Sequence, residues 1–194
     1  MNIFILDNDP VKAAQLQCDK HVVKMIVESA QMLSTAHRLL DGKVEKRPSK
    51  SGKRMVNYWR HPDKHLEISL YAAVHTGHPC TVWSMVSSEN YKWHYEHFIA
   101  LCDEYRFRYG KIHMTDVRLR HVLEQLPKNI PDGPLTKQPL AMQSNPECMF
   151  EDVVRSYRAF YQTKQERFKM AWTKRNIPEW FNVKPKSENQ LAYG

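Results

Sequence analysis

The spacing of apolar residues along the chain is mainly that of helices. Between residues 18 and 40, apolar side chains recur every three or four positions without an intervening Gly or Pro, and Asp41-Gly42 follows. This period is typical of an amphipathic helix, and a Gly after the last apolar position commonly ends one. The segment 18–40 is therefore the most clearly predicted helix.

Other helices are predicted from the same period and from Pro or Gly at their ends. They begin near Pro10 and cover 63–77, 79–108, 114–126 and 149–172. The apolar run at 2–6 is compatible with one short strand. Residues 43–62 are rich in Lys and Arg and contain Pro and Gly, so we expect a mobile basic loop there.

Composition favours one helix-rich globular domain. The 194 residues are 42% hydrophobic, with five Trp, nine Tyr and seven Phe against only six Gly. This length suffices for one domain with a substantial core. We therefore predict an all-α, single-domain multi-helix bundle over 1–183, with one short N-terminal strand possible, and a loosely ordered tail at 184–194.

The charge of the chain changes the picture of its partners. Lys and Arg number 29 against 21 Asp and Glu, giving a net charge of +8. A polyanion such as DNA, or a nucleotide, is a reasonable partner. In the basic loop, Lys50, Lys53 and Arg54 are the candidates for contacting phosphates.

The sequence shows no pattern typical of a secreted or membrane protein. The four Cys are widely spaced, the N-terminal segment turns acidic by its seventh residue, and no apolar run has the length of a membrane span. We expect a reduced cytoplasmic location and no membrane role.

Polar residues occupy two helix faces where a core helix would carry Leu. The polar face of the 79–108 helix comprises Trp83, Ser87, Asn90, His94, His97, Leu101, Tyr105 and Arg108, and that of the 18–40 helix comprises His21, Lys24, Glu28, Gln31 and Thr35. Buried polar groups need partners. The two faces are therefore predicted to meet and enclose a polar cleft.

Glu28 is the carboxylate placed to act as a general base in this cleft, with Lys24 one helical turn away to keep it ionised. His21 and His94 are its predicted catalytic partners. The residues expected to bind substrate are Lys24, Gln31, Trp83, Ser87, Asn90, Tyr91, Tyr105 and Arg108. A structural interpretation stays open, because a surface ion pair and internal hydrogen bonds explain the same residues.

No motif assigns a cofactor. P-loop, Rossmann, nucleophile-elbow and HExxH patterns are absent. We assign no metal ligand, although His94 and His97 lie on one helix face, so a metal-dependent helical hydrolase is an alternative. The 149–172 helix interleaves basic and aromatic residues; we expect its aromatic side chains to pack inward and Arg155, Arg158, Lys164 and Arg167 to lie outside.

Four blocks of the sequence carry a resemblance: LDNDPVKAAQLQCDKHVVKM, HPCTVWSMVSSENYKW, ALCDEYRFRYGKIH and PEWF. Over most of its length the chain resembles a family of largely uncharacterised proteins carried by T4-type bacteriophages. Members sometimes carry the label pyrimidine-dimer DNA glycosylase, although Asn2 stands where the small T4-type glycosylase uses a threonine amine. The resemblance implies a phage protein working in bacterial cytoplasm on nucleic acid or nucleotides.

These observations lead to three functional hypotheses. The first is an enzyme acting on DNA or a nucleotide, most concretely by hydrolysing an N-glycosidic bond with Glu28, His21 and His94. The second is a non-enzymatic phage protein that binds and modulates a host factor or nucleic acid. The third is the metal-dependent helical hydrolase.

Overall fold

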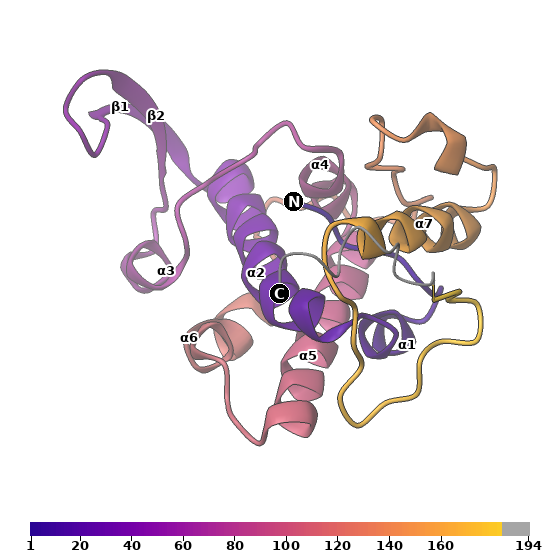
Figure 1. Ribbon diagram of the computed structural model, residues 1–194. Helices are drawn as coiled ribbons and strands as arrows, with labels where there is room; N and C mark the ends of the chain where they lie inside the picture. The colour runs from indigo at the N-terminus through magenta and orange to yellow at the C-terminus, as the bar shows by residue number, and fades with distance from the viewer. Residues whose placement is uncertain (184–194) are drawn as a thin grey trace.

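The computed structural model describes residues 1–183, and most of its secondary structure is helical (Figure 1). The helices are α1 (Pro10–Gln15), α2 (Asp19–Asp41), α3 (Lys64–Ser69), α4 (Pro79–Val86), α5 (Ser88–Tyr109), α6 (Met114–Leu123) and α7 (Val153–Gln162), with 3-10 turns η1 (Pro146–Cys148) and η2 (Thr163–Glu166). Strands β1 (Lys43–Pro48) and β2 (Met55–Arg60) form one antiparallel pair. The mostly helical prediction is confirmed, the single domain stays a prediction, and the tail predicted at 184–194 lies outside the described residues.

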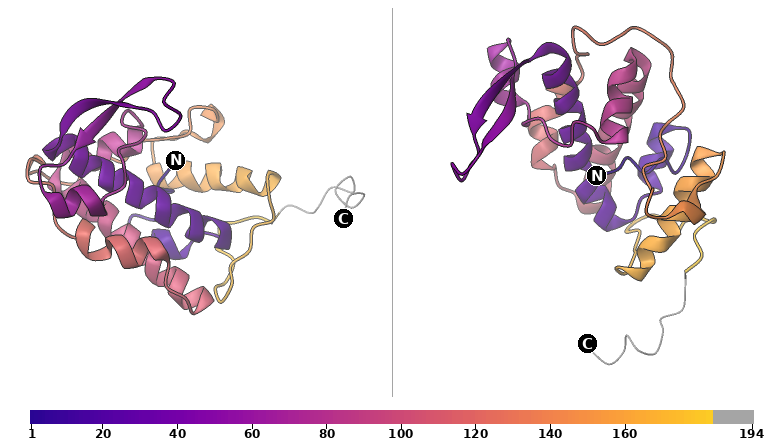
Figure 2. Two further views of the ribbon diagram at one scale, coloured as in Figure 1. Left: turned by 90° about the vertical axis from the view of Figure 1, so that its left-hand side faces the viewer. Right: turned by 90° about the horizontal axis from the view of Figure 1, so that it is seen from above.

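Helices α2 and α5 form the centre of the fold and pack against each other (Figures 1 and 2). Ile26 and Leu33 of α2 and Phe98 and Leu101 of α5 have no exposed surface. Helix α4 packs on both, while α1 covers α5 and α6 covers α2. The two polar faces predicted from the sequence therefore belong to the two most central helices.

The prediction of one continuous helix over 79–108 is wrong, because the chain breaks at Ser87 between α4 and α5. The Ser87 hydroxyl accepts a hydrogen bond from the Asn90 N–H (3.2 Å) and donates one to the Pro134 carbonyl oxygen (2.8 Å). Ser favours such caps over helix interiors because its side chain satisfies a free backbone N–H.

The prediction of a mobile loop at 43–62 is also wrong. β1 and β2 pair from Lys43 opposite Arg60 to Pro48 opposite Met55, and the hairpin projects from the end of α2 (Figures 1 and 2). β-branched and aromatic residues favour strands, and here the Arg47 guanidinium lies 3.5 Å from the centre of the Tyr58 ring on the opposite strand.

Two further predicted helices are shorter than expected. The helix predicted at 63–77 is only α3, because the buried Arg38 guanidinium donates to the carbonyls of Glu67, Leu70 and Tyr71, which a longer helix would use itself. The helix predicted at 149–172 is α7 followed by η2. Thr163 closes α7 by donating its hydroxyl to the Phe160 carbonyl (2.8 Å).

The apolar N-terminal run is buried but does not form the strand considered from the sequence. The Asn2 side chain accepts hydrogen bonds from the N–H groups of Ile3 (2.8 Å) and Phe4 (3.1 Å), and Phe4 adopts a left-handed φ of 57°. Both features interrupt extended pairing. In Figure 1 this segment runs from beside α2 and α4, behind α7, to α1.

Candidate functional site

Glu28, on α2, is a carboxylate around which cationic groups gather. Its Oε1 lies 3.2 Å from Lys24 Nζ; its Oε2 accepts the Asn2 N–H (3.1 Å) and lies 3.5 Å from the Met1 amino group. The Glu28 side chain is 14% exposed, whereas that of Lys24 is 64% exposed. Glu28 is thus held in a fixed position at the edge of solvent.

His21 lies two turns before Glu28 on the same face of α2 and is buried. Its Nδ1 is 2.7 Å from the Tyr161 hydroxyl, and its ring stacks on Phe4 with centroids 4.7 Å apart. Burial, and then the charges of Lys24 and Lys164, lower the pKa of His21 to about 4. A neutral His21 can accept or orient a proton at pH 7, but it is not available there as an imidazolium acid.

Lys164 is buried beside this cluster, so the prediction that it lies outside is wrong. The residue is 8% exposed, and its Nζ is 3.4 Å from the centre of the Phe160 ring. Burial, followed by the charges of Arg167 and Lys24, lowers its pKa to about 8. The sequence contained a signal for this position, because Lys164 follows Phe160 and Tyr161 by four and three residues on the aromatic face.

His78, the residue that precedes α4, is close enough to Glu28 for their charges to interact. Burial and the charges of the Met1 amino group and His75 lower the pKa of His78, while the charge of Glu28 raises it. Its Nδ1 accepts the Cys80 N–H (3.2 Å), so His78 also caps α4. Burial raises the pKa of Cys80 to about 11, which leaves its thiol protonated at neutral pH.

The polar face of α5 is largely satisfied by internal hydrogen bonds. His94 is fully buried and places Nδ1 2.7 Å from the Ser84 hydroxyl; burial and then His97 lower its pKa well below the usual value. Asn90 donates to the Trp83 carbonyl and the Thr136 hydroxyl (2.8 Å each) and accepts the Thr136 N–H (2.8 Å).

The other residues predicted to bind substrate also have structural contacts. Trp83 donates its indole N–H to the Thr136 carbonyl, Tyr91 donates to the Leu123 carbonyl, and Arg108 donates to Glu104, Asp19 and the Gln15 carbonyl. Tyr105 packs edge-on against His113, and Gln31 is half-buried. Their predicted contacts with substrate stay predictions.

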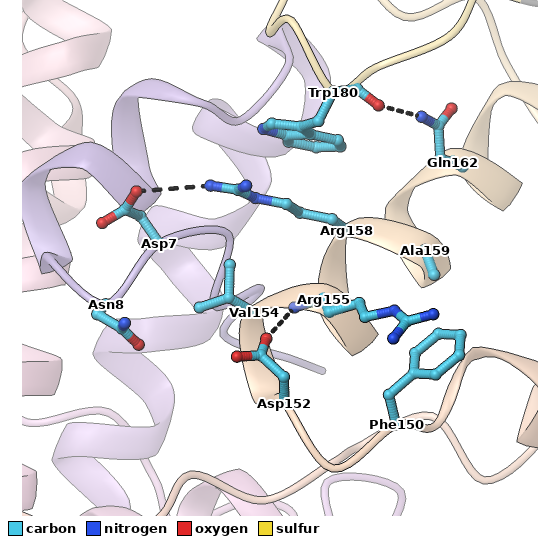
Figure 3. Close-up of a pocket in the computed structure, with 10 residues that line it drawn as sticks. All are labelled: Asp7, Asn8, Phe150, Asp152, Val154, Arg155, Arg158, Ala159, Gln162 and Trp180. Carbon is cyan, nitrogen blue, oxygen red and sulfur yellow. Dashed lines mark hydrogen bonds and ion pairs between the residues drawn. The ribbon is translucent and has the colours of Figure 1, made fainter.

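A groove of about 590 Å³ opens between the N-terminal segment, α7 and Trp180 (Figure 3). Arg158 spans it, donating to the Leu6 carbonyl (2.9 Å), pairing with Asp7 (3.5 Å) and stacking 5.4 Å from the Trp180 ring. Arg155 lies 4.1 Å from the Phe150 ring. Guanidinium groups beside aromatic faces are suited to phosphates and bases.

The N-terminal segment connects the groove to Glu28. Asn2 contacts Glu28, Phe4 stacks on His21, and Asp7 pairs with Arg158. Since five residues span at most about 18 Å, the backbone of Asn2 beside Glu28 and that of Asp7 in the groove are no further apart than this. The link between them was missed from the sequence because Asp7 and Arg158 are 151 positions apart.

The predicted phosphate contacts Lys50, Lys53 and Arg54 are exposed at the turn of the hairpin, and their role stays a prediction. Across residues 1–183, no helix combines the length and apolar character needed to cross a membrane. Compared with protein-family models, with curated proteins and with solved structures, the chain gives no match.

Proposed function

We propose that the chain is an enzyme that hydrolyses an N-glycosidic bond of DNA or a nucleotide at Glu28. One observation carries the proposal: the mostly buried Glu28 carboxylate is fixed by Lys24 and the Asn2 N–H, and the charge of the same Lys24 acts on His21, which is neutral at pH 7, and on Lys164, whose pKa is about 8. Hydrolysis of this bond needs a carboxylate to activate water and an acid for the departing base.

In the proposed reaction, Glu28 takes a proton from water as the water oxygen attacks the anomeric carbon. The bond from that carbon to the base nitrogen breaks, and the base leaves with the electron pair. Lys164, about nine-tenths protonated at pH 7, supplies the proton. This proposal gives Lys164 the acid role, because His94 is fully buried and hydrogen-bonded to Ser84.

The groove in Figure 3 would bind the rest of the substrate. Arg155 and Arg158 would contact phosphates, and Trp180 or Phe150 would stack on an unpaired base. The net charge of +8 supports a polyanionic substrate, as does the resemblance to the phage family.

The direct test is base release, measured by chromatography and mass spectrometry. Substrates are free nucleosides and duplexes that contain a deaminated, alkylated or ultraviolet-dimerised base. We expect Glu28→Gln to lose at least about 100-fold in rate, the scale of general acid–base catalysis. Glu89→Gln is the matched control, since Glu89 is 48% exposed and 2.7 Å from Lys92 Nζ. No release by the wild type, or full activity of Glu28→Gln, refutes the proposal.

A second candidate is a non-enzymatic protein that binds nucleic acid or a host factor. It is favoured by the internal hydrogen bonds of the α5 polar face and by the exposed basic turn of the hairpin. Reversing Lys50, Lys53 and Arg54 to Glu would lower the salt dependence of DNA binding by up to about 0.9 per lost phosphate contact. Lost binding without base release from any substrate would favour this candidate.

A further inference from the structure

Three potential metal ligands converge where α2 ends and the hairpin begins. His37 and Asp41 are one turn apart on α2, and His61 directly follows β2. One ligand atom from each lies within 4.8 Å of the others. The His61 and Asp41 side chains are 1% and 4% exposed, and His37 is equally buried.

The hairpin register brings these residues together. Lys43 pairs with Arg60, so the residue after β2 returns to the end of α2. Gly42 makes this close approach possible, because a Cβ there would lie 2.3 Å from the Arg38 carbonyl oxygen and 3.0 Å from that of Arg60. The geometry is thus imposed by the backbone.

Two imidazole nitrogens in the cluster make no protein hydrogen bond of good geometry, although the Gln125 backbone lies near the His37 ring. These are His37 Nδ1 and His61 Nε2, both buried. The distance from His61 Nε2 to Asp41 Oδ2 is 3.7 Å, too long for a hydrogen bond. Buried polar atoms normally have a partner, so two that converge on one carboxylate indicate a ligand between them.

The surrounding groups orient His37 and Asp41 as ligands. Tyr91 donates its hydroxyl proton to the Leu123 carbonyl (2.9 Å), so its oxygen accepts the His37 Nε2–H (2.9 Å). The lone pair of His37 is therefore on Nδ1. Asp41 is held by the N–H groups of Lys128 (2.8 Å) and Asn129 (2.9 Å). Such an outer shell is typical of metal sites.

We infer that His37, Asp41 and His61 bind one divalent transition-metal ion through two imidazole nitrogens and one carboxylate oxygen. This donor set suits Zn²⁺ or Fe²⁺ and leaves a coordination position for water. The ion would join the end of β2 to the last turn of α2. The inference uses none of the residues of the proposed glycosidic reaction, so each of the two proposals can be refuted without affecting the other.

Binding requires one proton to move. The His61 Nδ1 accepts the Asp63 N–H (3.1 Å), so neutral His61 carries its proton on Nε2 in the metal-free protein. When Nε2 binds the ion, this proton moves to Nδ1, and the Asp63 N–H loses its acceptor. The net charge of His61 is unchanged by this exchange.

The test is Zn²⁺ titration of full-length protein stripped with a chelator, read by competition with a chromogenic chelator. We expect one ion per chain and at least about 100-fold weaker binding in His37→Gln and His61→Gln, more than is usual for outer-shell changes. His121→Gln is the matched control, because His121 is 86% exposed and lies 3.5 Å from Glu124. Equal binding by wild type and His61→Gln, or no tight ion, overturns the inference.

Two measurements keep the test decisive if a ligand variant fails to fold. Tyr91→Phe keeps the ring and both histidine ligands but removes the hydrogen bond that orients His37, together with the one to the Leu123 carbonyl, and we expect about 10- to 100-fold weaker Zn²⁺ binding. The wild type loaded with one equivalent of Co²⁺ should show the visible absorption bands of a Co²⁺ ion that is bound by imidazole nitrogens in a site of low symmetry. The spectrum of hydrated Co²⁺, together with unchanged Zn²⁺ affinity of Tyr91→Phe, would overturn the inference.

Discussion

Replacing Lys164 by Met should stabilise the protein at neutral pH. The folded state lowers the pKa of Lys164 to about 8 from its ordinary 10.5, chiefly by burial. That difference corresponds to about 3 kcal/mol of destabilisation below pH 7. The nearby Phe160 ring, 3.4 Å from Nζ, favours the charged amine and offsets roughly 0.5–2 kcal/mol of this. We therefore expect a net gain of about 1–3 kcal/mol.

The sign of the pH dependence follows from the two pKa values. Between pH 8 and 10.5 the unfolded chain binds the Lys164 proton and the folded chain does not, so wild-type stability rises with pH. The advantage of Lys164→Met should fall from its neutral value to below about 1 kcal/mol at pH 10. Met is unbranched and can fill the volume of the lysine stem.

Urea unfolding followed by tryptophan fluorescence at pH 7, 9 and 10 measures this advantage. Lys169→Met is the control, because Lys169 is exposed on the same segment and should change stability by less than about 0.5 kcal/mol. A Lys164→Met protein that is less stable than the wild type at pH 7, or an advantage that does not change with pH, would refute the reasoning. Lys164, the proposed acid, would then have the pKa of an ordinary lysine.

Three further predictions concern the same fold. Lys24→Met should raise the pKa of Lys164, because the charge of Lys24 lowers it. The resonances of ¹³C-methylated lysines measure this pKa, and an unchanged titration of Lys164 would contradict the electrostatic interaction between the two lysines. Gly42→Ala should destabilise the protein by about 1–3 kcal/mol, because the new Cβ would clash with the backbone. Gly77→Ala is the control: its new Cβ has open space, so it should be neutral or stabilising by up to about 1 kcal/mol. Equal melting temperatures of the two variants would contradict the prediction. Asn90→Ala should lose about 2–4 kcal/mol in urea unfolding, since its buried partners become unsatisfied; a neutral effect would show that they find others.

Local sequence patterns predict parts of this fold well. Helix α2 follows from an uninterrupted period over 18–40 and is found at Asp19–Asp41, because one stripe of apolar residues decides its position. The break at Ser87 was missed since a single capping side chain ended the helix. The Lys24–Glu28 pair follows directly from helical spacing.

Features that depend on distant pairing could not be read in this way. The first strand and the turn of the hairpin contain several Lys, Pro48 and Gly52, so their local composition resembles a loop, and only pairing reveals Tyr58 stacked on Arg47. His37 and His61 are 24 positions apart in the sequence, and it is the pairing of the hairpin strands that brings them together in space. The groove likewise joins Asp7 to a helix near the other end of the chain.

The buried N-terminal segment has a consequence for how the chain folds during synthesis. Some of its partners come late: Asn2 bonds to Ala141, and the Leu6 carbonyl bonds to Arg158, 152 positions further on. At a synthesis rate of about 5–20 residues per second, roughly 8–30 s pass between the synthesis of Leu6 and that of Arg158. Contacts of such sequence separation also slow the final folding step. In the nascent chain, part of the surface of Ile3, Ile5 and Leu6 that the finished fold buries therefore stays exposed until these late segments have been synthesised.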